Sequence, residues 1–197
     1  MVVSCSIEEI MFPESDQRII HSPDVVYATI INQPGDLNTK VFADSQLRVL
    51  WNEDDRITLF NKYSYGFEYY FKGDDGDTGG AFGKVPNDDV VTGNALDKVY
   101  AVYPHQGNTK VNNDGIITFY LPAEQIYAPN SFGRNANTMV SHTDDVQLKF
   151  KNVGGYIAFN LYGNDVSVTS ITLKGNNHEL LAGKCSINMS TVSRLRR

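Results

Sequence analysis

Apolar residues alternate with polar ones along most of the chain, in short runs separated by turn-forming residues. Val146, Leu148 and Phe150, for example, are separated from one another by single polar residues. In a strand these three side chains share one face, while Gln147 and Lys149 between them face water. No stretch sustains apolar residues at helical spacing over three turns. The pattern therefore predicts an all-β fold of mainly antiparallel strands, with short helical turns at most.

Several runs have the length and the residue types of β-strands, with clusters of Gly, Asn, Asp and Pro between them. The run 156–162 is apolar almost throughout, which predicts a central strand covered on both faces. The run 166–173 alternates in two halves whose phase shifts at Thr169-Ser170, which predicts a β-bulge. Asp114-Gly115 predicts a hairpin turn. The remaining predicted strands are residues 25–31, 47–51, 57–60, 67–71, 99–103, 116–121 and 146–150.

The charge balance excludes two classes of partner. The 197 residues include 17 Lys and Arg and 23 Asp and Glu, for a net charge of −6. Such a chain has no basic field to hold a nucleic-acid backbone or an anionic membrane surface. Its 11 Tyr and 10 Phe are residues that pack sheets and cover binding faces. We therefore expect no nucleic-acid partner, and membrane contact only through a lipid anchor.

Two cysteines, Cys5 and Cys185, are too few for a disulfide framework. Cys185 lies in an alternating run and is interpreted as a small apolar strand residue. Cys5 follows Val2-Val3-Ser4, which matches a bacterial lipobox, the motif whose cysteine is lipidated after signal-peptide cleavage. The apolar segment of a signal peptide is not part of the sequence before it. Cys5 is therefore a lipidation candidate, with a chance match as the alternative.

The sequence carries no signature of a catalytic or metal site. Its four histidines are far apart, and it contains neither a nucleophile-elbow motif nor a catalytic cysteine context. Asp74, Asp75 and Asp77 form the most acidic loop and are a candidate calcium site. That loop lacks the ligand spacing of an EF-hand, so a solvated hairpin tip is the alternative. We therefore expect a protein that is not an enzyme and holds no metal or cofactor.

Tyrosines gather in residues 63–71, where Tyr65, Tyr69 and Tyr70 are candidates for an aromatic surface that binds a glycan. Strand packing is the alternative explanation of the same residues. Tyr65 and Tyr69 share one parity along the run, and Tyr70 has the other. At least one of the three tyrosines is therefore expected to be exposed.

Four motifs, taken in their order along residues 39–187, resemble those of fimbrillin-like and Mfa-like N-terminal domains of Bacteroidetes surface lipoproteins. The first motif fits the family's Trp-x-x-x-Asp-x-Ile-x-x-Phe signature, and the second resembles its strand that ends in Tyr-Pro. The matching residues are Trp51, Asp55, Ile57 and Phe60; Tyr103-Pro104; Leu121-Pro122 with Gln125; and Ile171, Leu173, Leu181 and Gly183.

This resemblance implies a Greek-key β-sandwich of the transthyretin-like kind over residues 21–188. Residues 1–20 would then be the remnant of an N-terminal lipoprotein anchor and a linker, and residues 189–197 a flexible tail. It further implies an exported lipoprotein at the outer membrane and cell surface, acting as a fimbrial subunit, an accessory subunit or an adhesin. Its partners would be other fimbrial subunits, or host and glycan ligands. A carbohydrate-binding cell-surface lipoprotein is the alternative function.

The resemblance also implies a mode of assembly. Fimbrillin precursors are often trimmed after an arginine near the N-terminus, and subunits then fill each other's exposed sheet edges by β-addition. Arg18, just ahead of Ile19-Ile20, is the residue in that position. Arg18 is thus a candidate for proteolytic processing, with a merely solvated side chain as the alternative.

Overall fold

The structure is a computed structural model that describes residues 22–31, 42–43, 49–87, 93–128, 131–155, 157 and 159–192. The regular elements among these residues are strands, together with one short helix, α1 (Met189–Val192). The prediction of an all-β fold is confirmed. Within the described part of the chain, no helix has the length and apolar sequence needed to cross a bilayer.

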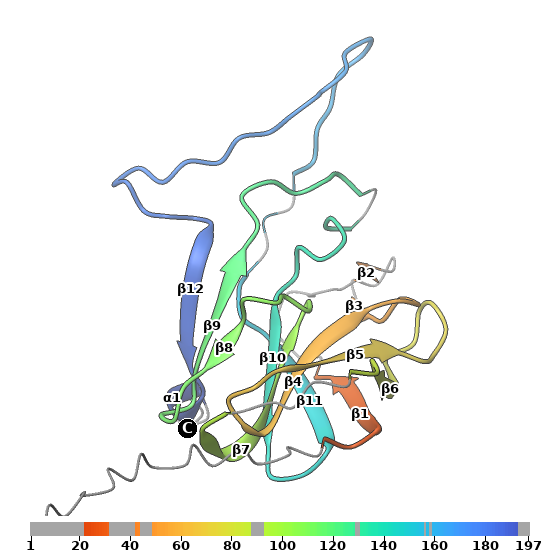
Figure 1. The fold of residues 1–197 in the computed structure, drawn as a ribbon. Coiled ribbons are helices and arrows are strands. Elements are labelled where there is room, and N and C mark those ends of the chain that lie inside the picture. Colours follow the sequence, from red (N-terminus) through yellow and green to blue (C-terminus); the bar gives the residue numbers. More distant parts are fainter. Residues whose placement is uncertain are drawn as a thin grey trace, which may run out of the picture.

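Seven strands close into a barrel (Figure 1). In order around the barrel they are β1 (Val25–Ile30), β11 (Gln147–Asn152), β10 (Met139–Thr143), β7 (Ala95–Tyr103), β4 (Arg56–Tyr63), β5 (Phe67–Phe71) and β6 (Gly79–Lys84). β1 completes the ring, because it pairs in parallel with β11 and antiparallel with β6. The two separate sheets of a sandwich are therefore not observed here: β1 joins the two strands that would otherwise be edges.

A three-stranded sheet of β8 (Lys110–Val111), β9 (Ile116–Leu121) and β12 (Gly183–Asn188) packs beside the barrel (Figure 1). The β8–β9 hairpin turns at Asp114-Gly115, as predicted. Gly115 has a φ of +71°, and its N–H donates to the Asn112 carbonyl at 3.0 Å. A Cβ at Gly115 would lie 2.6 Å from the Tyr100 hydroxyl, so both the backbone conformation and the close packing require glycine. β2 (Phe42–Ala43) and β3 (Val49–Leu50) form a separate two-stranded sheet.

Alternation along β7 divides the apolar residues between two cores. Val99, Ala101 and Tyr103 point into the barrel, where they join the cluster that fills its interior. Tyr100 and Val102 point outward. There they pack against residues of the three-stranded sheet and α1, including Ile117, Phe119 and Met189. The second core therefore holds the small sheet against the outer face of the barrel.

Trp51 is the largest side chain of the barrel interior and is fully buried. Its ring centroid lies 5.0 Å from Phe82, 5.4 Å from Tyr103 and 5.5 Å from Phe150, with the rings close to perpendicular. These edge-to-face contacts join rings from β6, β7 and β11. The backbone N–H of Trp51 donates to the Asp77 carbonyl at 2.7 Å, and this hydrogen bond connects Trp51 to the loop before β6.

Six of the predicted strands are confirmed, namely those at 25–31, 57–60, 67–71, 99–103, 116–121 and 146–150. The run 47–51 is confirmed in part by β3, with Trp51 in an isolated bridge to Asp77. Cys185 lies half-buried in β12 against the second core, as its strand interpretation predicted. β6 and β10 were not predicted, and β12 was predicted only through the interpretation of Cys185. Gly79-Gly80 and Gly83 deprive β6 of the apolar alternation on which strand prediction depends.

Two predicted strands are wrong. The described residues of 156–162 and all of 166–173 form no strand and are exposed. The barrel closes through β1 without a position for a further central strand, and the described residues of the run 156–162 stay exposed. The bulge expected at Thr169-Ser170 has no strand to interrupt, and a register shift lies instead between Asn61 and Tyr63 of β4.

The Trp51 contacts lead to a stability prediction. We expect Trp51→Ala to lower the free energy of unfolding by about 3–5 kcal/mol, the range for truncation of a buried aromatic residue. Trp51→Phe should lower it by much less, because ring contacts persist and the buried indole N–H finds no acceptor among the described residues. Urea unfolding followed by circular dichroism measures both. Equal losses in the two variants would contradict the role given to ring packing.

Candidate functional site

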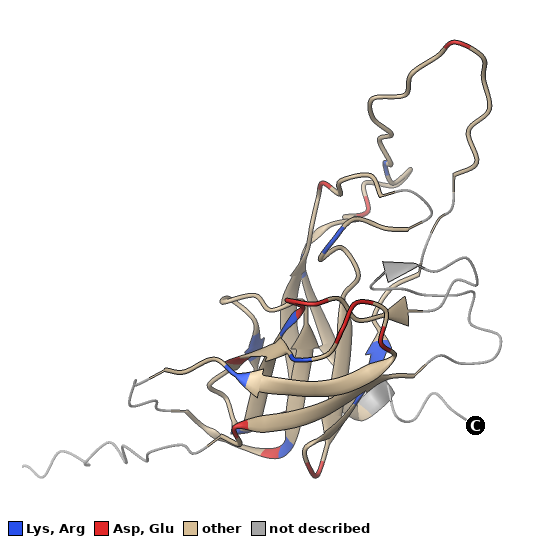
Figure 2. Cartoon of the chain, turned by 90° about the vertical axis from the view of Figure 1, so that its right-hand side faces the viewer, with Lys and Arg blue, Asp and Glu red and all other residues tan. Residues whose placement is uncertain are grey.

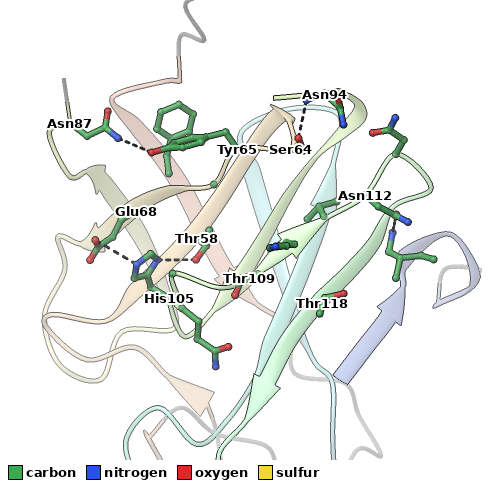
Figure 3. Close-up of a pocket in the computed structure, with 18 of the residues that line it drawn as sticks. Thr58, Ser64, Tyr65, Glu68, Asn87, Asn94, His105, Thr109, Asn112 and Thr118 are labelled. Carbon is green, nitrogen blue, oxygen red and sulfur yellow. Dashed lines mark hydrogen bonds and ion pairs between the residues drawn. The ribbon is translucent and has the colours of Figure 1, made fainter. Parts of the chain in front are cut away.

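A cleft of about 1080 Å³ lies between the barrel and the three-stranded sheet (Figure 3). Its walls are the turn between β4 and β5, residues 85–87 after β6, the loop after β7 and the β8–β9 hairpin. The second core positions these walls, because it fixes the small sheet on the barrel's outer face. A cleft of this size with convergent polar groups is the leading candidate for a ligand site.

Neutral hydrogen-bonding side chains are the largest group among the residues that line the cleft. Those with amide or hydroxyl groups are Thr58, Ser64, Asn87, Asn94, Gln106, Thr109, Asn112, Asn113 and Thr118. The charged or titratable lining residues are Glu68, His105, Lys110 and Asp114. Their formal charges nearly cancel, so the cleft suits a neutral polar ligand rather than an ion.

Tyr65 supplies an aromatic ring at the wall of this cleft (Figure 3). The ring packs edge-to-face on Phe67, with centroids 5.0 Å apart. The Asn87 amide donates to the Tyr65 hydroxyl at 3.3 Å. Both contacts limit the motion of the ring, so Tyr65 can present a fixed apolar face beside the amide and hydroxyl groups.

His105 and Glu68 form an ordered polar cluster in the cleft (Figure 3). The His105 Nδ1 atom is 2.8 Å from the Thr58 hydroxyl, and its Nε2 atom is 3.6 Å from a Glu68 oxygen. The other Glu68 oxygen accepts from Arg56 at 2.6 Å. Hydrogen bonding to Glu68 raises the pKa of the Arg56 guanidinium above its ordinary value. Both Glu68 oxygens therefore face partners from the protein itself.

Other lining amides stabilise the loops that form the walls. The Gln106 amide donates to the Tyr120 carbonyl at 2.7 Å and its oxygen accepts from the Tyr120 N–H at 2.9 Å. Gln106 thus joins the loop after β7 to β9 in the way a neighbouring strand would. The Asn112 oxygen accepts from the backbone N–H groups of Asp114 and Ile116 at 3.1 and 2.8 Å. These contacts give the cleft rigid walls.

Thr109 differs from these residues because its hydroxyl has no partner. The residue lines the cleft and is only 7% exposed, and the buried oxygen makes no hydrogen bond to any described residue. A buried polar atom without a partner carries a free-energy penalty. The oxygen is shielded from solvent, so a ligand or water in the cleft completes its hydrogen bonding only where the atoms that cover it move aside.

The three tyrosines expected to form an aromatic surface do not lie together. Tyr69 is fully buried in the barrel, where its hydroxyl donates to the Pro23 carbonyl and contacts Ser22. Tyr70 points outward and is 37% exposed, which confirms that at least one tyrosine of the run is exposed. Among the three, Tyr65 is the one that lines the cleft.

Asp74, Asp75 and Asp77 lie in the exposed loop between β5 and β6. Asp75 accepts a hydrogen bond from the Glu53 N–H at 2.7 Å, and Asp77 accepts one from the Asp74 N–H at 3.1 Å. The carboxylates thus bind backbone groups that shape the loop. In the described ranges, no three or more His, Cys, Asp or Glu side chains are grouped as metal ligands would be. The lipidation candidate Cys5 and the processing candidate Arg18 lie outside the described residues.

Asp55 is the most buried carboxyl group among the described residues, at 1% exposure. Its two oxygens accept from the Tyr103 hydroxyl at 3.0 Å and from the Asn52 N–H at 2.8 Å. Burial raises the pKa of Asp55 from 3.8 to about 6, while the hydrogen bonds to Asn52 and Tyr103 lower it in part. Burial and the neighbouring Asp55 carboxyl likewise raise the pKa of Tyr103. Asp55 does not line the cleft, so its perturbed pKa reflects structural burial.

Sequence reasoning missed most of the cleft residues. Asn87, His105, Gln106 and Thr109 lie in loops whose composition is typical of turns, and they meet only after the small sheet packs on the barrel. Tyr65 carried a signal, because it was one of three tyrosines considered for ligand contact. Comparison of the chain with protein families, curated proteins and solved structures finds no match in any of the three.

Asp55 makes stability depend on pH in a defined direction. Because its folded-state pKa of about 6 exceeds its ordinary value of 3.8, the folded protein retains a proton that the unfolded chain releases. Proton binding to Asp55 stabilises the folded protein fully below pH ~4, and this stabilisation is lost as the pH rises to ~6. The free energy of unfolding decreases by about 3 kcal/mol over this range. Asp55→Asn should remove this decrease. Urea unfolding across this pH range measures it, and identical pH slopes for the two proteins would refute the assignment.

Proposed function

We propose that this chain is a non-catalytic, exported surface protein that acts as a fimbrial subunit, an accessory subunit or an adhesin-like β domain. The observation that carries this proposal is the cleft of neutral amides and hydroxyls beside Tyr65. The ordered family motifs from Trp51 to Gly183 support the exported, surface-displayed setting. In this proposal Cys5 carries the lipid anchor at the outer membrane.

The chemistry of the cleft favours a glycan as the adhesin ligand. Sugars offer many neutral hydroxyls that donate and accept hydrogen bonds, and their C–H faces pack on aromatic rings. The cleft matches both features, with amides such as Asn87 and Asn94 on its walls and the Tyr65 ring among them. The same observation favours the second candidate function, a carbohydrate-binding cell-surface lipoprotein that does not assemble into fimbriae.

The contacts of the cleft carboxylates support binding without catalysis. Glycoside hydrolysis uses two carboxyl groups, one of which donates a proton to the leaving oxygen. Glu68 is engaged by Arg56 at 2.6 Å and lies 3.6 Å from His105. Asp114 lies at the exposed β8–β9 turn, where its carboxylate accepts from the Asn112 amide at 3.3 Å. Both carboxylates thus have structural partners in the walls.

The transthyretin-like Greek-key architecture belongs to this proposal. In the order β7-β4-β5-β6, the strands β4, β5 and β6 are consecutive in the chain and pair in sequence. The next strand, β7, returns to lie beside β4, which is the strand order of a Greek key. Packing of the β8-β9-β12 sheet on the outer face of β4, β7 and β10 adds a sheet-on-sheet layer. Both features support the family relation that the motifs imply.

Assembly by strand complementation would use the small sheet. In the barrel β1 is paired on both sides, so its backbone groups are already engaged. Among the described strands, β12 pairs with β9 alone and β8 pairs with β9 alone. The outer flanks of β8 and β12 are therefore the positions at which a strand of a sibling subunit would add.

The fimbrial proposal predicts an effect of proteolytic trimming. Cleavage after Arg18 should increase the mass of the assemblies that the chain forms, because it releases the N-terminal segment that precedes β1. Light scattering after size-exclusion chromatography measures this mass. A chain with Arg18→Gln, exposed to the same arginine-specific protease, is the control and should keep its original mass. An unchanged mass after complete cleavage would count against fimbrial assembly and leave the second candidate function.

Thr109 provides a sharper test of the cleft. Thr109→Val replaces the unpartnered hydroxyl by a methyl group of similar shape, so stability should be unchanged or slightly increased. Glycan affinity should fall by roughly tenfold, the effect of a hydrogen bond lost from a buried site. Glycan-array binding followed by titration calorimetry on the best ligand measures this change.

Thr138→Val is the matched control for this test. Thr138 also has a buried hydroxyl without a partner among the described residues, and it does not line the cleft. This variant should keep full glycan affinity. Failure of every glycan to bind the intact chain, or equal losses in the two variants, would exclude the cleft as the glycan site.

A further inference from the structure

An exposed apolar arm projects from the body of the protein between β11 and β12 (Figure 1). We define the arm as residues 159–174, all of which the structure describes. Fifteen large hydrophobic side chains are exposed in the described residues. Seven of them lie in the arm, namely Phe159, Leu161, Tyr162, Val166, Val168, Ile171 and Leu173. This concentration on one segment calls for an explanation, because exposed apolar surface in soluble proteins usually marks an interaction site.

The sequence of the arm is that of a β-strand that lacks its partner. Residues 166–173 alternate apolar and polar side chains in two halves and include several β-branched residues. Their backbone forms no strand ladder. A closed barrel offers no edge to receive the arm, since every barrel strand already has two neighbours. A second chain can therefore satisfy both the apolar side chains and the backbone groups of the arm.

The charges of the arm indicate that the second chain is another copy of this protein. Figure 2 shows an acidic position, in red, at the tip of the arm. Asp165 is the one carboxylate between residues 159 and 174, and Lys174 closes the run. The two residues bracket the alternating run 166–173. They are roughly 30 Å apart in an extended strand, too far to pair within one chain. If two copies align antiparallel, each Asp165 lies beside the Lys174 of the other copy.

The apolar residues are compatible with the same alignment. In an antiparallel pair the half with Val166 and Val168 meets the half with Ile171 and Leu173 of the other copy, so aliphatic residues face aliphatic residues. The arrangement has two-fold symmetry, and each copy contributes the same surface. We propose that the arm joins two copies of this chain into a homodimer by antiparallel pairing of residues 166–173.

This inference goes beyond the proposed function. The arm is an internal segment that pairs with its own counterpart, whereas fimbrial complementation adds a strand of a sibling subunit to β8 or β12. The proposed homodimer also does not depend on the cleft. Arm variants should therefore keep glycan binding, so that failure of the dimer and failure of the glycan site are separate results.

The first experiment measures the mass of the full chain by sedimentation equilibrium. We expect a dimer that dissociates on dilution. Val168→Asp combined with Ile171→Asp should abolish the dimer, because it places carboxylates in the pairing face. Tyr27→Asp is the matched control: Tyr27 is 52% exposed on the outside of the barrel, away from the arm, and its substitution should leave the dimer intact. A monomer at all concentrations, or a dimer unaffected by the arm substitutions, would overturn the proposal.

The second experiment tests the antiparallel alignment. Asp165→Lys or Lys174→Asp alone turns both attractive pairs of the homodimer into repulsive ones and should raise its dissociation constant roughly tenfold. An equimolar mixture of these two single variants should recover dimers, because both charge pairs are restored between unlike copies. Recovery in the mixture cannot arise within one chain. Absence of recovery, or association of the arm only with a different protein or with lipid vesicles, would refute antiparallel self-pairing.

Discussion

The pairing of β1 with both β6 and β11 determines the architecture. Parallel pairing with β11 and antiparallel pairing with β6 turn a row of seven strands into a closed barrel. Closure removes the edges of the main sheet and encloses the rings around Trp51. It also leaves later strand-like segments of the chain without a place in the sheet. The exposed arm and the separate small sheet both follow from this one constraint.

The second core connects the architecture to the candidate site. Outward-facing residues such as Tyr100 and Val102 would face solvent on an isolated barrel, and the small sheet covers them. The space left where this sheet meets the barrel is the cleft. Many of its lining residues lie in loops and turns, which tolerate amides and hydroxyls, while neighbouring strands keep most of their apolar residues for packing. A rigid scaffold with polar loops is a sound basis for recognition of a neutral ligand.

Much of the fold was predictable because a strand buried on one face has apolar residues at every second position of its sequence. Val26, Ala28 and Ile30 are buried and alternate with exposed neighbours, so β1 could be recognised from its period of two. The β8–β9 turn was equally clear, since Gly115 adopts a conformation that favours glycine. β6 could not be predicted, because its glycines hide the alternation. The cleft was largely unpredictable: of the aromatic candidates Tyr65 lines it, and Thr109 carries no local signal at all.

The sequence by itself determined that the chain is all-β, which residues form most of the strands, and that the net charge is negative. These properties depend on local periodicity and on composition. Tertiary structure alone decided that the sheet closes, that residues 166–173 find no partner strand, and that Tyr65, His105 and Thr109 share one cleft. The physical reason is that strand pairing joins residues distant in sequence. An alternating pattern indicates that a segment can form a strand, but it does not identify the strand with which that segment pairs.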